Sequence, residues 1–251
     1  MRKRDFMLYI DKQEPNRDVS AEISRVKRNN NWTDLDKKDS QRVRECFDDL
    51  NKTAIKLQLY KEQHGLCAYC MRRIEYDDNR MRIEHFVPIQ VDGEKALSYN
   101  NFLGCCDGEA YDIGNEKRVL CCDAAKGNRQ MYLNPLNRTQ MEKIKYDRNG
   151  IISTFPKDEN MEYDINHVLH LNGLINETDG RTVADTSFSL VKGRKEVYDN
   201  YVRYMRGLAK RGKLNKAVLQ NKVRQLETSD TYVNYVGVWL FFLKRKIRDC
   251  C

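Results

Sequence analysis

The sequence lacks the long apolar runs that mark membrane-spanning proteins. No stretch of its 251 residues reaches the ~18 consecutive apolar residues that a spanning helix needs. Residues 1–5 are mostly charged and contain no apolar signal core, and neither internal repeats nor low-complexity segments occur. These absences predict a cytosolic protein, in which clustered cysteines are more often metal ligands than disulfide partners.

What the sequence does contain is an ordinary globular composition, with 40% hydrophobic and 33% charged residues. The length suits one large or two small domains. We expect an N-terminal arm and helix over residues 1–54 and a compact core over residues 55–140. A small β-hairpin followed by a basic helical region is expected over residues 141–251.

Positive charge is concentrated in the C-terminal quarter of the chain. The net charge is +8, and residues 187–251 carry 15 Lys and Arg against 5 Asp and Glu. Such a basic block suggests a polyanionic partner, most plausibly nucleic acid. A solvated helix surface explains the charge equally well, and charge alone favours that explanation. The nucleic-acid interpretation gains weight only if the same chain carries a catalytic site.

Apolar spacing and turn residues predict the elements of the first half of the chain. Three- and four-residue spacing predicts one helix over residues 36–64 that ends at Gly65. The turn-rich residues 77–79 lie between two short segments, which predicts a hairpin whose second strand ends at Glu84-His85. Residues 107–118 are polar and contain glycine, and we interpret them as an insertion between two cysteine pairs; residues 123–130 are expected to form a short helix.

The second half is expected to contain one hairpin and then helices only. Asp147-Arg-Asn-Gly150 separates two β-prone segments and is a hairpin signal. From Ser187 onward the spacing is helical. Residues 233–247 are apolar on all sides, which is typical of a helix buried in a core or against a partner. The apolar residues 6–10 predict a strand or an extended arm.

Six of the nine cysteines fall between residues 67 and 122, in a Cys-x-x-Cys pair and two vicinal pairs. Four thiolates can hold Zn²⁺ tetrahedrally, and such closed sites are structural. Two adjacent cysteines rarely bind the same ion, because their short tether strains the geometry, so one cysteine from each vicinal pair is expected to bind. The predicted zinc ligands are Cys67, Cys70, Cys106 and Cys122; the alternative pair is Cys105 and Cys121.

The Glu84-His85 pair is the candidate reactive group inside this cysteine-rich segment. Successive side chains of a strand point to opposite faces, so one can reach a metal ion while the other reaches a substrate. Histidine is the usual general base near neutral pH. A lone histidine is more often a surface or core residue, but its place beside a carboxylate and among cysteines favours function.

The order of these motifs resembles that of HNH endonucleases. It is similar, more narrowly, to the PtuB family, the HNH component of Septu-type and some retron-associated antiphage systems. The likeness covers about residues 55–130 and is carried by four blocks. They are Gln63-His-Gly-Leu-Cys-Ala-Tyr-Cys70, Ile83-Glu-His-Phe86, Leu103-Gly-Cys-Cys-Asp-Gly108 and Cys122-Asp-Ala-Ala-Lys-Gly-Asn128.

The resemblance implies an α+β chain with a ββα-metal core, stapled by a four-cysteine zinc site and embedded in a mainly helical chain. By position in the motif, His85 corresponds to the general base and Asn101 to the residue that orients the loop and the base. Glu84 and Asp123 correspond to the ligands of a catalytic metal ion. An aspartate in place of the usual His or Asn at position 123 favours Mg²⁺ or Mn²⁺.

The resemblance also implies a substrate and a partner. Lys126 or Asn128 is expected to contact phosphate, and the substrate is nucleic acid, with DNA favoured over RNA. Members of the PtuB family work with PtuA, an ATPase, and the apolar C-terminal helix or the N-terminal arm is the candidate docking element. Two alternatives remain open: a zinc-ribbon nucleic-acid-binding protein, and a scaffold in which zinc is purely structural. Neither of them needs Glu84, His85 and Asp123 together.

Overall fold

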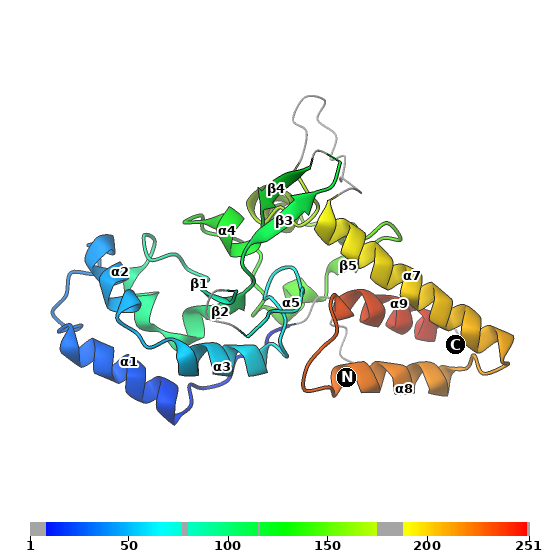
Figure 1. Cartoon of the computed structure of the whole chain (residues 1–251), viewed down its shortest axis with the longest axis horizontal. Coiled ribbons are helices and arrows are strands. Elements are labelled where there is room, and N and C mark those ends of the chain that lie inside the picture. Colours follow the sequence, from blue (N-terminus) through cyan, green and yellow to red (C-terminus); the bar gives the residue numbers. More distant parts are fainter. Residues whose placement is uncertain (1–8, 77–79, 115, 175–187, 250–251) are drawn as a thin grey trace.

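The protein is described by a computed structural model that covers residues 9–76, 80–114, 116–174 and 188–249. It confirms the α+β class: helices alternate with two-stranded antiparallel sheets. Helices α1–α3 lie at one end of the molecule, α7–α9 lie at the other, and the short strands lie between them (Figure 1). Within the described residues, every helix is too short or too polar to cross a bilayer.

Three helices form the N-terminal end: α1 (Arg17–Asn29), α2 (Ser40–Asp48) and α3 (Thr53–Glu62). The single helix predicted over residues 36–64 was wrong, because the chain breaks between α2 and α3. Asn51 lies in this break, and its side chain accepts a hydrogen bond at 3.1 Å from the backbone N–H of Thr53, the first residue of α3. Of the predicted N-terminal arm, residues 6–8 lie outside the described residues, and the N–H of Ile10 donates to the Pro135 carbonyl.

Strands β1 (Arg82–His85) and β2 (Phe102–Cys105) pair antiparallel at the centre of the molecule, with Glu84 opposite Leu103. The predicted hairpin over residues 72–86 was therefore wrong in its pairing. Residues 72–76 contribute only an isolated bridge between Leu66 and Arg73, and residues 77–79 lie outside the described part of the chain. The true partner of β1 follows a long connection that contains two 3₁₀ turns, Gly93–Leu97 and Tyr99–Asn101.

The insertion over residues 107–118, to which the sequence assigned no secondary structure, contains a second pair of strands, β3 (Glu109–Asp112) and β4 (Lys117–Leu120). Its strands are polar and largely exposed, which is why their apolar pattern is weak. The helix that follows, α4 (Cys122–Lys126), is shorter than predicted. It ends at Gly127, whose positive φ of 55° favours glycine.

The predicted hairpin around Asp147-Arg-Asn-Gly150 is confirmed as β5 (Ile144–Tyr146) and β6 (Ile152–Thr154). It lies between two helical segments, α5 (Arg138–Met141) on one side and α6 (Glu159–Tyr163) with a π turn (Asp164–Val168) on the other. Gly150 has φ +89°, and a Cβ there would lie 2.3 Å from the Val191 carbonyl oxygen. Only glycine therefore lets the hairpin turn contact the next helix so closely.

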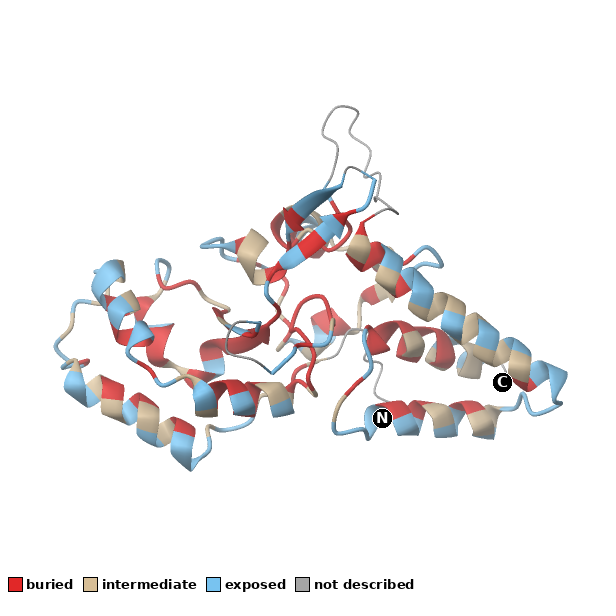
Figure 2. Ribbon diagram, viewed as in Figure 1, coloured by how far each residue is buried: buried red, intermediate tan, exposed pale blue. Residues whose placement is uncertain are grey.

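The all-helical C-terminal region is confirmed as α7 (Ser189–Lys210), α8 (Lys216–Glu227) and α9 (Val236–Asp249). The apolar helix α9 packs against α7, α8 and β5, and half of its residues, including most of the apolar ones, are buried within this chain (Figure 2). Packing within this chain covers these buried residues of α9, and docking of a partner on this helix stays a prediction. The division into domains stays a prediction.

Candidate metal and active site

Four buried cysteine sulfur atoms lie within 4.8 Å of one another and could hold a metal ion such as zinc. The sulfur atoms of Cys70 and Cys106 are 3.9 Å apart. That separation matches the edge of a tetrahedron built from ~2.3 Å zinc–sulfur bonds, which is about 3.8 Å. The structure thus brings together the set that the sequence predicted: Cys67, Cys70, Cys106 and Cys122.

Local backbone structure explains why the Cys-x-x-Cys pair turns both sulfur atoms to one point. The N–H of Met71 donates to the Cys67 carbonyl at 3.1 Å, and the N–H of Cys67 donates to the Arg72 carbonyl at 2.8 Å. The N–H of Arg72 then donates to the sulfur of Cys70 at 3.5 Å. A hydrogen bond to sulfur stabilises the thiolate form that binds a metal ion.

The remaining cysteines of the segment are buried thiols outside this set. Burial raises the pKa of Cys105 to about 12, so this residue stays protonated. Cys121 lies beside the cluster, where Nη2 of Arg72 is 3.7 Å from its sulfur and 3.3 Å from the sulfur of Cys106. This guanidinium, which the sequence did not single out, offsets the negative charge of the thiolates. Cys250 and Cys251 lie outside the described residues.

The carboxylates of Glu84, near the end of β1, and Asp123, in the first turn of α4, line the same cavity. Oε1 of Glu84 accepts from the hydroxyl of Tyr69 at 3.1 Å and lies 2.6 Å from Nζ of Lys126. Oδ2 of Asp123 lies 2.7 Å from Nε of Arg82. Burial, followed by the effect of Asp123, raises the pKa of Glu84 well above its usual value.

Lys126 was expected to contact phosphate, and the structure places it elsewhere. Its side chain is 1% exposed, and Nζ donates to the backbone carbonyl of His85 at 3.0 Å besides pairing with Glu84. An ammonium group held in this way ties α4 to the end of β1 and cannot reach a bound strand. Asn128, the other candidate, is exposed at the rim of the cavity described below.

His85 is buried and faces different neighbours from Glu84, as strand alternation predicts. Its ring lies 4.4 Å from that of Phe47 and 5.2 Å from that of Phe102. Nε2 is 3.0 Å from the carbonyl oxygen of Ala96, and because a carbonyl can only accept, Nε2 carries the proton. Burial lowers the pKa of His85 to about 4. The ring is therefore neutral at pH 7, with its lone pair on Nδ1.

Asn101 holds the connection between β1 and β2 in place. Its Oδ1 accepts from the N–H of Val87 at 2.8 Å, and its Nδ2 donates to the carbonyls of Val87 and Lys95 at 3.0 and 3.2 Å. The same connection contains Ala96, whose carbonyl orients the ring of His85. Asn101 therefore acts on the histidine indirectly, by fixing the backbone that contacts it.

Replacing Asn101 by alanine should lower the free energy of unfolding by about 1–3 kcal/mol, because it removes three hydrogen bonds that the buried side chain makes to the partly buried backbone of the connection. Chemical denaturation measures this change. The matched control is Asn100→Ala, since Asn100 is the exposed neighbour on the same turn. Equal stabilities of the two variants would contradict the role of Asn101.

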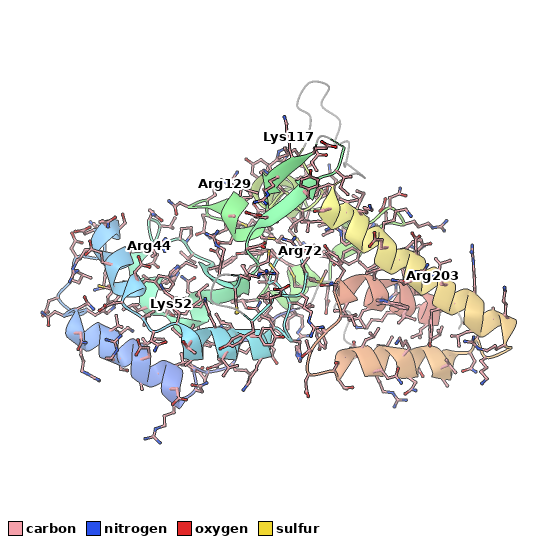
Figure 3. All side chains as sticks on the ribbon, viewed as in Figure 1. Arg44, Lys52, Arg72, Lys117, Arg129 and Arg203 are labelled. Atoms are coloured by element: carbon pink, nitrogen blue, oxygen red, sulfur yellow. The ribbon has the colours of Figure 1, made fainter. Side chains whose placement is uncertain are left out.

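The carboxylates and the histidine line one cavity of about 200 Å³. It is polar, and its walls come from β1, α2, α4 and the residues after β1. Arg82 and Arg44 also line it; Arg44 projects from α2, labelled in Figure 3. Sequence reasoning missed both arginines and Tyr69. Tyr69 could have been noticed inside the Cys-x-x-Cys pair, whereas no local signal marks Arg44.

Neither a family model nor a curated protein matches this chain. The site is therefore interpreted from its own geometry.

Proposed function

We propose that this protein is a metal-dependent endonuclease of the HNH class, which hydrolyses nucleic-acid phosphodiester bonds. The observation that carries the proposal is the meeting of Glu84, Asp123 and His85 in one polar cavity. The order β1, β2, α4, with the carboxylates at the junction of strand and helix, is also what a ββα-metal core requires. Resemblance to the PtuB family supports the same assignment.

The donor set at this junction fits a hard divalent cation. Two carboxylates line the same cavity, and Mg²⁺ and Mn²⁺ prefer such oxygen ligands, with water completing the shell. Glu84 and Asp123 would hold the ion, which supplies Lewis-acid stabilisation of the charge that develops on the scissile phosphate. Lys126 and Arg82, which pair with the two carboxylates, limit the negative charge that accumulates between them.

His85 is the proposed general base. Its Nε2 proton is committed to the Ala96 carbonyl, so Nδ1 is the atom that takes the proton from the attacking water. A neutral ring is needed for that step, and burial keeps it neutral. Asn101 contributes by holding the backbone that orients the ring.

Arg44 is the proposed phosphate contact in place of Lys126. It lines the cavity from α2, and its charge is close enough to lower the pKa of His85. Lys126 and Arg82 are paired with Glu84 and Asp123, whereas Arg44 forms no ion pair with a carboxylate of the described residues. Its guanidinium is thus available to a phosphate oxygen.

Arg44→Ala is expected to slow cleavage by ~10²–10³-fold, the scale on which one preorganised donor to the reacting group acts. Initial rates of plasmid cleavage in Mg²⁺ measure the effect. Arg42→Ala is the matched control, because Arg42 lies on the same helix, is exposed and pairs with Glu45. If Arg44→Ala cleaves as fast as Arg42→Ala, the proposed contact between Arg44 and the phosphate is contradicted.

The direct test of the function is incubation of the purified protein with plasmid DNA and with total RNA in Mg²⁺ and in Mn²⁺. We expect cleavage that depends on the added ion. Binding of nucleic acid without cleavage under every condition, including the presence of a PtuA-like ATPase, would leave the zinc-ribbon alternative.

A role in antiphage defence with that partner is part of the proposal, and co-expression followed by size-exclusion chromatography tests it.

A further inference from the structure

A second concave site lies far along the chain from the cysteine cluster, between the β5–β6 hairpin and the end of α9. It encloses about 480 Å³, and α9 packs against β5 at its floor. We call it the hairpin groove. The residues that matter to its chemistry are Glu142, Lys143, Lys145, Phe155, Arg245 and Arg248.

Phe155 is the unusual member of the hairpin groove. Its side chain is 68% exposed, more than any other large apolar side chain described. Nζ of Lys145 lies 4.0 Å from the centre of its ring, so one face carries a cation. A hydrogen bond from the Phe155 N–H to the Lys143 carbonyl fixes the backbone beside the strand. A ring held in this way presents an apolar face to solvent without stabilising the core.

The charge around this ring is predominantly positive. Lys143 is neutralised by Asp158 at 2.8 Å, and Glu142 contributes one negative charge. Lys145 and Arg245 contribute two positive charges, and Arg248 lies beside them. The two arginines are three residues apart near the end of α9, so they lie on the same side of the helix. The hairpin groove thus combines an exposed aromatic ring with flanking cations.

We propose that the hairpin groove binds single-stranded nucleic acid. An unpaired base stacks on Phe155, and the neighbouring phosphates contact Lys145 and Arg245. Grooves that combine stacking rings with cations are the usual design for single strands. A duplex keeps its bases stacked inside, so it cannot use the ring. This inference deepens the proposed nuclease function, on which it rests, by naming the form of the nucleic acid that the protein holds.

The test measures binding and not cleavage, so it uses the His85→Ala protein without added Mg²⁺. Fluorescence anisotropy compares labelled oligothymidylate, oligouridylate and a DNA duplex. Phe155→Ala should weaken single-strand binding by ~5–150-fold, the range reported for one stacked base, and leave duplex binding nearly unchanged. Phe155→Trp should restore affinity, whereas Tyr163→Ala, which removes another exposed ring, should have little effect.

The contribution of the cationic side chains is measured separately, by the salt dependence of binding. Arg245→Gln should reduce the slope of log K against log salt by ~0.7, the value for one lost phosphate contact on a single strand. Arg203→Gln is the control, because Arg203 is exposed on α7 outside the hairpin groove (Figure 3). The inference is overturned if Phe155→Ala binds single strands as the parent does, or loses duplex affinity equally.

The two proposals fail in distinguishable ways. If the protein binds single strands through Phe155 but never cleaves them, the hairpin-groove proposal stands and the nuclease proposal fails. If the protein cleaves nucleic acid but its affinity for single strands does not depend on Phe155 or Arg245, the nuclease proposal stands and the hairpin-groove proposal fails. The affinities for oligothymidylate and oligouridylate, compared with each other, show whether the hairpin groove prefers DNA or RNA.

Discussion

Replacing His85 by alanine is expected to lower the cleavage rate by ~10²–10⁴-fold, the usual scale for a lost general base. The physical reason is the fixed tautomer of the ring. The Ala96 carbonyl holds the proton on Nε2 at 3.0 Å, and burial keeps the ring neutral with a pKa of about 4. No other described histidine lines the cavity that contains Glu84 and Asp123.

Two additional measurements separate this chemical role from a structural one. His85→Gln can keep the hydrogen bond to Ala96 but has no basic nitrogen, so it should be as inactive as His85→Ala while unfolding like the wild type. Imidazole added to His85→Ala should partly restore cleavage by entering the vacated space beside Phe47. A folded His85→Gln protein that cleaves within a few-fold of the wild type would exclude the general-base role.

The second large effect is expected at the cysteine cluster. Cys106→Ser should abolish stoichiometric zinc binding and unfold the region around β2 and α4, because structural zinc sites contribute on the order of 10 kcal/mol to folding. Cys67→Ser should act in the same way, since both sulfur atoms belong to the set within 4.8 Å. Zinc content by elemental analysis and thermal unfolding measure the two consequences.

The adjacent residue provides the matched control. Cys105→Ser changes a buried thiol at the last position of β2, one residue before the predicted ligand and outside the set of four. It should keep a full complement of zinc and lose only the modest stability that a buried polar hydroxyl costs. If Cys105→Ser loses zinc and Cys106→Ser retains it, the assignment of ligands is reversed.

Some features of the site could be predicted because they depend on residues close together in the sequence. The Cys-x-x-Cys spacing sets one pair of ligands. The strain of a short tether selects one cysteine from each vicinal pair, and the structure brings together the predicted set. The hairpin around Gly150 was also predictable, since its turn residues specify the backbone conformation at that point.

Other features depended on the three-dimensional fold, because they join residues that are distant in the chain. The pairing of β1 with β2 was missed, since a strand carries no mark of its partner when a long connection lies between them. Lys126 was assigned to phosphate from the motif, yet packing of α4 against β1 buries its ammonium beside Glu84. Arg44 and Phe155 had no local signal, because their importance comes from the surfaces they face.

The four cysteines of the candidate metal site could therefore be predicted from the linear chain, because their spacing and chemistry favour zinc. The assignment of the carboxylates to a harder ion stays a proposal. The folded chain alone assigns which cations are committed to internal ion pairs and which face open cavities. The physical reason is that a charge's role depends on its nearest opposite charge and on its exposure to water, and both are set by long-range packing.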